Sequence, residues 1–243
     1  MKKLTVEAAE RLASKFRTEA QFSQVEPLNC HSVLQSKHIL TVFRPMSVNA
    51  GGLSIVSPDR QQRYMLINSC RPIGRQRFTI AHELYHLFYD DNPEPHMCFD
   101  TNGGKNPREA NADLFASALL MPRDGIIAYI PDSELHQNHV SLGTVMRLEQ
   151  LFGVSHQAMC YRLKRLKLIT EEYLQQLLSI SPARTAWEFG YSTKLYDDGD
   201  GRKAVIGDFI AKAKVLFDED RISEGHYMEL KNLVNDGESE DCP

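Results

Sequence analysis

The stretch Arg77–Asp90, which reads R-F-T-I-A-H-E-L-Y-H-L-F-Y-D, decides how this 243-residue chain is interpreted. Its apolar residues fall on nearly all sides of a helix, which is typical of a helix buried in a core. On that helix His82 and His86 lie one turn apart on one face, and Glu83 lies about 100° around the axis. This spacing suits one zinc ion and a carboxylate that holds its water. The alternative is two hydrogen-bonded core histidines beside a buried acid, and we favour the metal because buried polar groups need partners.

A catalytic zinc usually has three protein ligands, so this motif leaves the site one ligand short. The metzincin solution is excluded, because Tyr89 and Asn92 stand where it needs glycine and histidine. The best remaining candidate is Glu109, on a later predicted helix. With Asn106 as N-cap, Glu109 also suits a capping box, which is the alternative role. Asp113, one turn on, is the fallback ligand or a partner that orients a metal-bound histidine.

Two segments together resemble the ImmA/IrrE family of zinc metallopeptidases. They are residues 75–87, R-Q-R-F-T-I-A-H-E-L-Y-H-L, and residues 109–122, E-A-N-A-D-L-F-A-S-A-L-L-M-P. The second is similar to the family motif E-x-x-x-[DN]-x-F-A-x-x-L-L-M-P, whose first acid is the third zinc ligand. The resemblance implies one Zn²⁺ per chain with the ligands His82, His86 and Glu109. Tyr85 departs from the pattern, since many members carry glycine there, and it puts a phenol near the site.

The resemblance also implies a function. Such proteins are typically selective cytoplasmic proteases that cleave a helix-turn-helix transcriptional repressor in mobile elements, phages or stress responses. We therefore expect a zinc-dependent endopeptidase with Glu83 as general base. The alternatives are a DNA-binding or partner-binding regulator that uses the zinc site as a sensor, and a metal-free antitoxin or antirepressor. The intact Glu83 favours the peptidase, because a purely structural metal site needs no general base.

A peptidase also needs a donor that stabilises the oxyanion of the tetrahedral intermediate. The sequence leaves four residues open for this role: Tyr85, Tyr89, His96 and Arg108. His96 is a further candidate metal ligand, although we favour an exposed loop histidine.

Composition limits the classes of protein that fit. A formal net charge of -4 argues against a protein that binds nucleic acid through overall positive charge. No apolar run reaches the length of about eighteen residues that a transmembrane helix needs. The N-terminus leads into an amphipathic helix and not into the apolar core of a signal peptide, so we expect a cytoplasmic protein. The five cysteines are scattered without a C-x-x-C, which predicts free thiols.

The pattern predicts an α+β fold with a small antiparallel sheet ahead of the zincin-type active-site helices. A helix is expected over Thr5–Phe16. Three segments have the apolar and β-branched character of strands: Ile39–Phe43, Leu53–Val56 and Tyr64–Ile67. In zincins an edge strand of such a sheet commonly holds the substrate in extended form. Asp90–Asn106 is rich in Asp, Asn, Pro and Gly and is predicted to be a loop.

Ser141–Leu168 has the spacing of a helix-turn-helix, with Gly153 in the turn. Its second helix carries a group of cations that are candidate DNA or partner contacts: Arg162, Lys164, Arg165 and Lys167. We favour a helical hairpin packed on the peptidase, with solvated cations near a helix C-terminus. Family members often have such a segment here, but Glu149 stands where DNA-binding versions usually have a small residue.

The expected division has three parts. Residues 1–135 form a zincin-like metallopeptidase domain, residues 136–182 a helix-turn-helix-like unit, and residues 183–243 a C-terminal helical region. In the third part we expect amphipathic helices over 205–217 and 223–234, followed by an acidic disordered tail.

Overall fold

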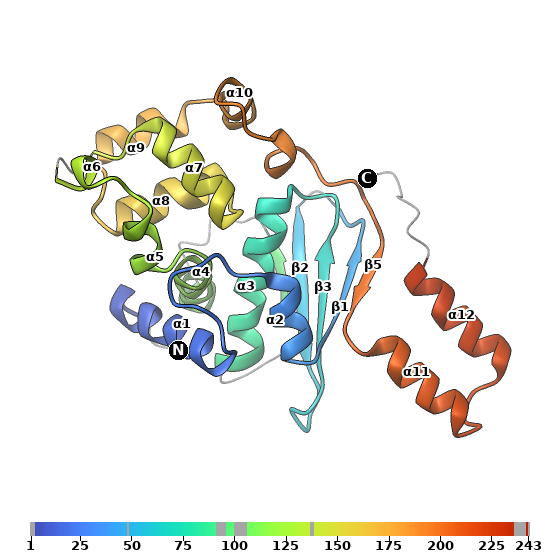
Figure 1. The fold of residues 1–243 in the computed structure, drawn as a ribbon. Helices are drawn as coiled ribbons and strands as arrows, with labels where there is room; N and C mark the ends of the chain where they lie inside the picture. The colour runs from blue at the N-terminus through green and yellow to red at the C-terminus, as the bar shows by residue number, and fades with distance from the viewer. Residues whose placement is uncertain are drawn as a thin grey trace.

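The computed structural model describes residues 3–47, 49–90, 96–99, 106–136, 139–235 and 242, and for 96–99 and 233–235 it describes the backbone alone. It confirms the α+β class. A sheet and the helices that cover it come first, and most of the second half is helical (Figure 1). Among the helices so described, none is both long and apolar enough to cross a membrane.

The described strands form one sheet with the order β4-β2-β3-β1-β5. They are β1 Ile39–Arg44, β2 Ala50–Val56, β3 Arg63–Asn68, β4 His96–Phe99 and β5 Ala204–Ile206. Every pair is antiparallel except β1 and β3, which run parallel. The expectation of a purely antiparallel sheet is therefore wrong for this pair. After β1 the chain passes to the far side of β3 and returns through the β2–β3 hairpin, so β1 and β3 point the same way.

Two strands lie where the sequence predicted none. β4 lies inside the predicted loop Asp90–Asn106, and β5 lies at the start of the predicted helix over 205–217. Both are short, and their partners β2 and β1 are distant in the sequence. Such strands form because a partner edge is present, so local composition gives little sign of them.

α3, Ile73–Tyr89, is the central helix of the first half (Figure 1). It lies against β2 and β3 and also packs on α4, Pro107–Leu120. α1, Val6–Glu19, packs on α4 in turn, and α2, Cys30–Ser36, lies against β1. Thr5 caps α1, as predicted. The active-site helices are therefore held between the sheet and the N-terminal helix.

The second half contains most of the remaining helices. They are α5 Arg123–Ala128, α6 Asp132–His136, α7 Leu142–Phe152, α8 His156–Arg165, α9 Glu171–Leu178, α10 Pro182–Glu188, the 3-10 turn η1 Thr193–Leu195, α11 Phe209–Asp218 and α12 Glu224–Asn235. Ser141 and Ser155 cap α7 and α8, as predicted. Gly153 joins the two helices in the left-handed conformation, φ 62°, which glycine adopts without a steric penalty.

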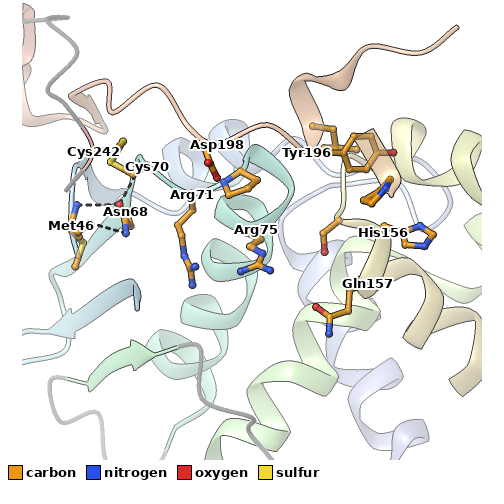
Figure 2. A pocket seen from close by; sticks show the side chains of 14 residues that line it. Met46, Asn68, Cys70, Arg71, Arg75, His156, Gln157, Tyr196, Asp198 and Cys242 are labelled. Atoms are coloured by element: carbon orange, nitrogen blue, oxygen red, sulfur yellow. Dashed lines mark hydrogen bonds between the residues drawn. A yellow bond between two sulfur atoms is a disulfide. The ribbon is translucent and has the colours of Figure 1, made fainter. Parts of the chain in front are cut away.

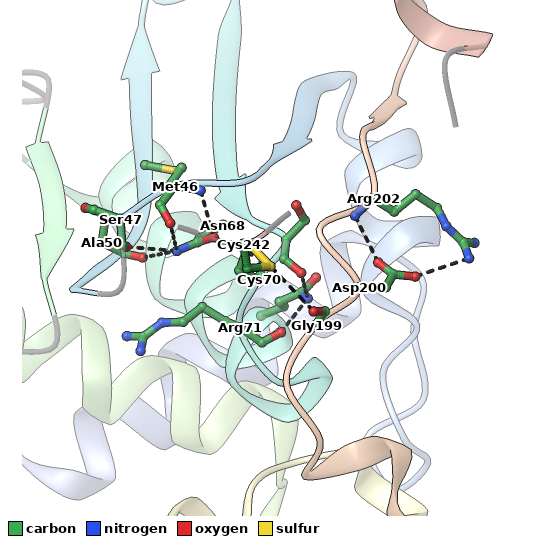
Figure 3. The surroundings of a disulfide bond; sticks show 12 residues. Met46, Ser47, Ala50, Asn68, Cys70, Arg71, Gly199, Asp200, Arg202 and Cys242 are labelled. Carbon is green, nitrogen blue, oxygen red and sulfur yellow. Dashed lines mark hydrogen bonds and ion pairs between the residues drawn. A yellow bond between two sulfur atoms is a disulfide. The ribbon is translucent and has the colours of Figure 1, made fainter. Parts of the chain in front are cut away.

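A disulfide joins Cys70, after β3, to Cys242 near the end of the chain (Figure 2 and Figure 3). The prediction that all cysteines are free thiols is wrong for this pair. The partners are 172 residues apart, and no spacing rule connects such positions. Cys30 and Cys160 are free and buried, as predicted. Gly199 N–H also donates to the Cys70 carbonyl at 3.0 Å, so the C-terminal region meets this corner of the sheet twice.

Candidate metal centre

α3 brings His82, Glu83 and His86 into the interior, where each side chain is almost completely buried. The helix approaches the sheet closely at Gly52 of β2. A Cβ at that position would lie 2.8 Å from the Thr79 methyl group, so glycine permits this contact. The polar face of α3 is therefore held directly against β2.

α4 delivers Glu109 to the same place. Asn106 caps the helix and Pro107 occupies its first turn, as the sequence predicted, and the side chain of Asn106 accepts from Arg108 N–H. The carboxylate of Glu109 turns toward α3, with one oxygen 3.2 Å from His82 Nε2 and the other 3.5 Å from His86 Nε2. Glu109 thus combines the N3 position with the geometry of a metal ligand.

The two imidazoles face each other through Nε2, with 3.1 Å between the nitrogens. The Nδ1 atom of His82 lies 2.9 Å from Asp113, and that of His86 lies 3.0 Å from Asp90. Because a carboxylate only accepts, the two aspartates favour the tautomer with the proton on Nδ1 and a lone pair on Nε2. Lone pairs at this distance repel, and a cation between them relieves the repulsion.

A zinc ion fits this group. Ligands about 2.0–2.1 Å from a tetrahedral ion lie roughly 3.3 Å from one another. The three separations here are 3.1 Å, 3.2 Å and 3.5 Å. The donor set of two imidazoles and one carboxylate is also that of known catalytic zinc sites.

Asp113 and Asp90 lie behind the two histidines and orient them. Asp113 contacts the Nδ1 of His82, on the opposite side of the ring from Glu109, which suits a supporting role better than direct ligation. Asp90 was not singled out from the sequence, although it follows His86 at the same four-residue spacing that separates His86 from His82. It also pairs with Arg108. The spacing signal was present, but Asp90 also begins the segment that was predicted to be a loop.

Burial lowers the pKa of His86 to about 4. The ring is therefore neutral at neutral pH, which is the form that binds a metal.

Glu83 contacts Ser54 of β2, whose hydroxyl donates to Oε2 at 2.5 Å. Both residues are buried. Ser54 is a site residue that the sequence did not reveal, because only the pairing of the helix with the sheet brings it near Glu83. Ser54 also pairs with His96 across the β2–β4 ladder.

The structure separates the candidate oxyanion donors. Tyr85 is buried and packs with Tyr89 and Phe115 in an aromatic cluster of the core. Burial raises the pKa of Tyr89 to about 12. Arg108 is paired with Asp90. The backbone of His96 lies on β4, opposite Ser54, and its side chain falls outside the described part of the chain.

The four cations of the helix-turn-helix-like unit do not form one exposed patch. Arg162 is 1% exposed, donates to the Met121 carbonyl at 2.8 Å and pairs with Glu10 of α1. Arg162 is therefore not available to contact DNA, so its prediction as a candidate DNA contact is wrong. Lys164 pairs with Glu171 at 3.2 Å. Of the remaining two, Arg165 is half-buried and Lys167 is exposed.

A second group of metal-binding residue types, Glu149, His156 and Cys160, lies buried between α7 and α8. His156 donates through Nδ1 to Glu149 at 2.6 Å and through Nε2 to the Leu177 carbonyl at 2.8 Å. The Cys160 sulfur lies 3.8 Å from Nδ1 and 3.5 Å from Nε2, and both nitrogens already have oxygen acceptors. Burial lowers the pKa of His156, but Cys160 and Glu149 together raise it to about 10. This group is an ion pair of imidazolium and carboxylate.

Comparison with known proteins agrees with the geometry. The family described as IrrE N-terminal-like domain, Peptidase_M78, matches residues 34–164, which is more than half of the chain. This range contains α3, α4 and α7, and all of α8 except its last residue. No curated protein matches the sequence. With the motif, the fold and the match in agreement, the chain belongs to the IrrE N-terminal-like family of peptidases.

Proposed function

We propose that this protein is a zinc-dependent endopeptidase that cleaves a protein substrate. One observation carries the proposal: two histidine Nε2 atoms and the Glu109 carboxylate converge at tetrahedral separations beside a buried glutamate. A site with only a structural metal would need the first three groups but not Glu83.

Each residue has a separate task in the proposed reaction. His82, His86 and Glu109 hold the metal, and a bound zinc ion would polarise the scissile carbonyl and lower the pKa of the attacking water. Glu83 takes a proton from that water and delivers it to the leaving amine. Ser54 donates to one oxygen of Glu83 and so helps to orient the carboxylate.

The sheet supplies a place for the substrate. Among the described strands β4 is the outermost on its side of the sheet, and its neighbour β2 carries Ser54. An extended peptide that adds to the outer side of β4 would run past the candidate metal centre. The resemblance noted above supports a helix-turn-helix repressor as the substrate, an antirepressor role and a cytoplasmic location. These specific assignments, like the three-part domain division, remain proposals.

Elemental analysis tests the centre first. Purified wild-type protein should hold about one zinc per chain, as expected for a single tetrahedral site. Glu109→Ala should lose it, while Glu134→Ala, which removes a carboxylate of α6 that accepts from Ser141, is the control that retains it. Zinc retained by Glu109→Ala would mean that Asp113 or His96 supplies the third ligand.

Cleavage is tested on a peptide library derived from a bacterial proteome. Wild type should generate new N-termini that disappear with a chelator and in Glu83→Gln. A chain that holds zinc and cleaves nothing would favour the alternative, a regulator that senses metal. The burial of Arg162 weakens a DNA-binding form of that alternative.

A further inference from the structure

The second helix of the helix-turn-helix-like unit is attached to the active-site helix. A Cβ at Gly74, in the first turn of α3, would lie 2.7 Å from the Ser155 nitrogen at the start of α8. Arg77 of α3 donates to the Gly153 carbonyl at 3.3 Å. The turn between α7 and α8 therefore packs on the beginning of α3.

The other end of α8 lies against α4, the helix that carries Glu109, and against α1. Arg162 donates to the Met121 carbonyl at the end of α4 and pairs with Glu10 of α1. α8 therefore extends from the beginning of α3 to the end of α4.

One stripe of α8 is turned away from the core. Gln157, Tyr161 and Arg165 are spaced four residues apart, so they lie on one face of the helix. Gln157 is exposed and Tyr161 is 46% exposed, which is unusual for so large an aromatic side chain on a helix packed into the protein. The adjacent Arg162 is buried and fixes the rotation of the helix.

A cavity of about 620 Å³ lies where α8 and α3 meet, and Arg71, Arg75 and Gln157 contribute to its lining. Figure 2 shows the guanidinium groups of the two arginines and the amide of Gln157 pointing to the same side of this pocket. Arg75 precedes His82 by seven residues, which is two helical turns and therefore the same face of α3. At 1.5 Å per residue this is about 10 Å along the helix, or roughly three residues of extended peptide.

We propose that Arg71, Arg75 and the Gln157–Tyr161 stripe form a substrate-recognition surface that binds an acidic segment of the cleaved protein about three residues from the scissile bond. This inference rests on the proposed peptidase function. Arginine suits the role because its guanidinium group binds a carboxylate through two parallel hydrogen bonds. Tyr161 offers apolar contact area and a hydroxyl group to the same segment.

A peptide suits this surface better than a nucleic acid. Asp198 lines the same cavity. Its carboxylate would repel a continuous row of phosphates but tolerate one or two carboxylates placed beside the arginines. The net charge of -4 disfavours a long polyanion in the same way.

The first test profiles cleavage of the peptide library by wild type, by the double variant Arg71→Gln/Arg75→Gln and by Arg184→Gln. Arg184 is an exposed cation of α10 and serves as the charge-matched control. Wild type and control should enrich Asp or Glu about three residues from the cleaved bond. The double variant should lose that preference, with roughly a tenfold lower kcat/KM for acidic peptides and unchanged cleavage of neutral ones. Cleavage without any acidic preference in wild type would overturn the inference and leave the peptidase intact.

The second test does not depend on activity. Full-length Glu83→Gln protein is titrated with a fluorescein-labelled peptide that carries paired glutamates, and with the same peptide carrying glutamines. The acidic peptide should bind about tenfold more tightly, and Arg71→Gln/Arg75→Gln or Tyr161→Ala should reduce the difference. Equal affinities would overturn the inference, as would displacement of the acidic peptide by duplex DNA. If wild type cleaves no peptide at all, the proposed function fails and this binding comparison alone decides the role of the surface.

Discussion

Two buried histidine–carboxylate groups in this protein contain similar residues and differ in what their ring nitrogens face. At the candidate metal centre the protonated nitrogens of His82 and His86 each contact an aspartate, and the two Nε2 atoms face each other at 3.1 Å. In the second group both nitrogens of His156 already have acceptors. The first arrangement calls for a cation and the second excludes one. The residue types alone do not show which of the two groups can bind a metal ion.

The largest expected effect is on catalysis. Glu83→Gln should keep zinc and lower cleavage by at least about 10²–10⁴-fold, because the amide cannot accept the proton of the water. The assay is peptide cleavage with metal content measured on the same sample. Full activity in this variant would remove Glu83 from the mechanism.

Glu149→Ala tests the second group, in which Glu149 pairs with His156. Removing one partner of a buried ion pair leaves His156 charged without its carboxylate, which costs about 3–5 kcal/mol of unfolding free energy. Tyr196, which donates to Glu149 at 2.8 Å, also loses its acceptor. Denaturant unfolding measures the loss. Zinc stoichiometry should not change, and a drop in zinc would show that this group binds metal after all.

A smaller effect is expected where an aspartate supports a ligand. Asp113→Asn should weaken zinc binding about 10–100-fold, because the amide orients and polarises His82 less well than the carboxylate. Competition with a chromogenic chelator measures the affinity. Complete loss of zinc, equal to that in Glu109→Ala, would instead identify Asp113 as a direct ligand.

The last expected effect is gradual, because it is a slope of stability against pH. The pKa of His156 is raised to about 10 from an ordinary value of 6.5. The folded state therefore holds a proton that the unfolded state releases between these two values. The contribution of the ion pair is complete below pH 6.5 and is lost as pH rises toward 10. Unfolding curves across this window should show the slope in wild type, and Glu149→Gln should flatten it.

The sequence predicted the features that depend on neighbouring residues. The His82–His86 spacing, the Asn106 start of α4 and the Ser141 and Ser155 caps follow from local periodicity and capping, and the structure contains each element. The grouping of Glu109 with the histidines also appears; Glu109 was the best candidate third ligand from the sequence, and the family resemblance supported it.

The features that the sequence missed depend on long-range contacts. β4 and β5 exist because β2 and β1 offer edges, and Ser54 reaches Glu83 only through the packing of α3 on the sheet. Arg162 looked like a surface cation, but its partners lie on α1 and at the end of α4. The sequence within a few residues of these positions gives no sign of these contacts.

The Cys70–Cys242 bond closes a covalent ring through almost all of the second half of the chain. A single cut anywhere between these residues opens the ring without releasing a fragment. In the oxidised protein, a nick made by this or another protease would add the mass of one water and yield two bands only after reduction. Non-reducing electrophoresis would therefore hide self-cleavage in the loops around the candidate metal centre.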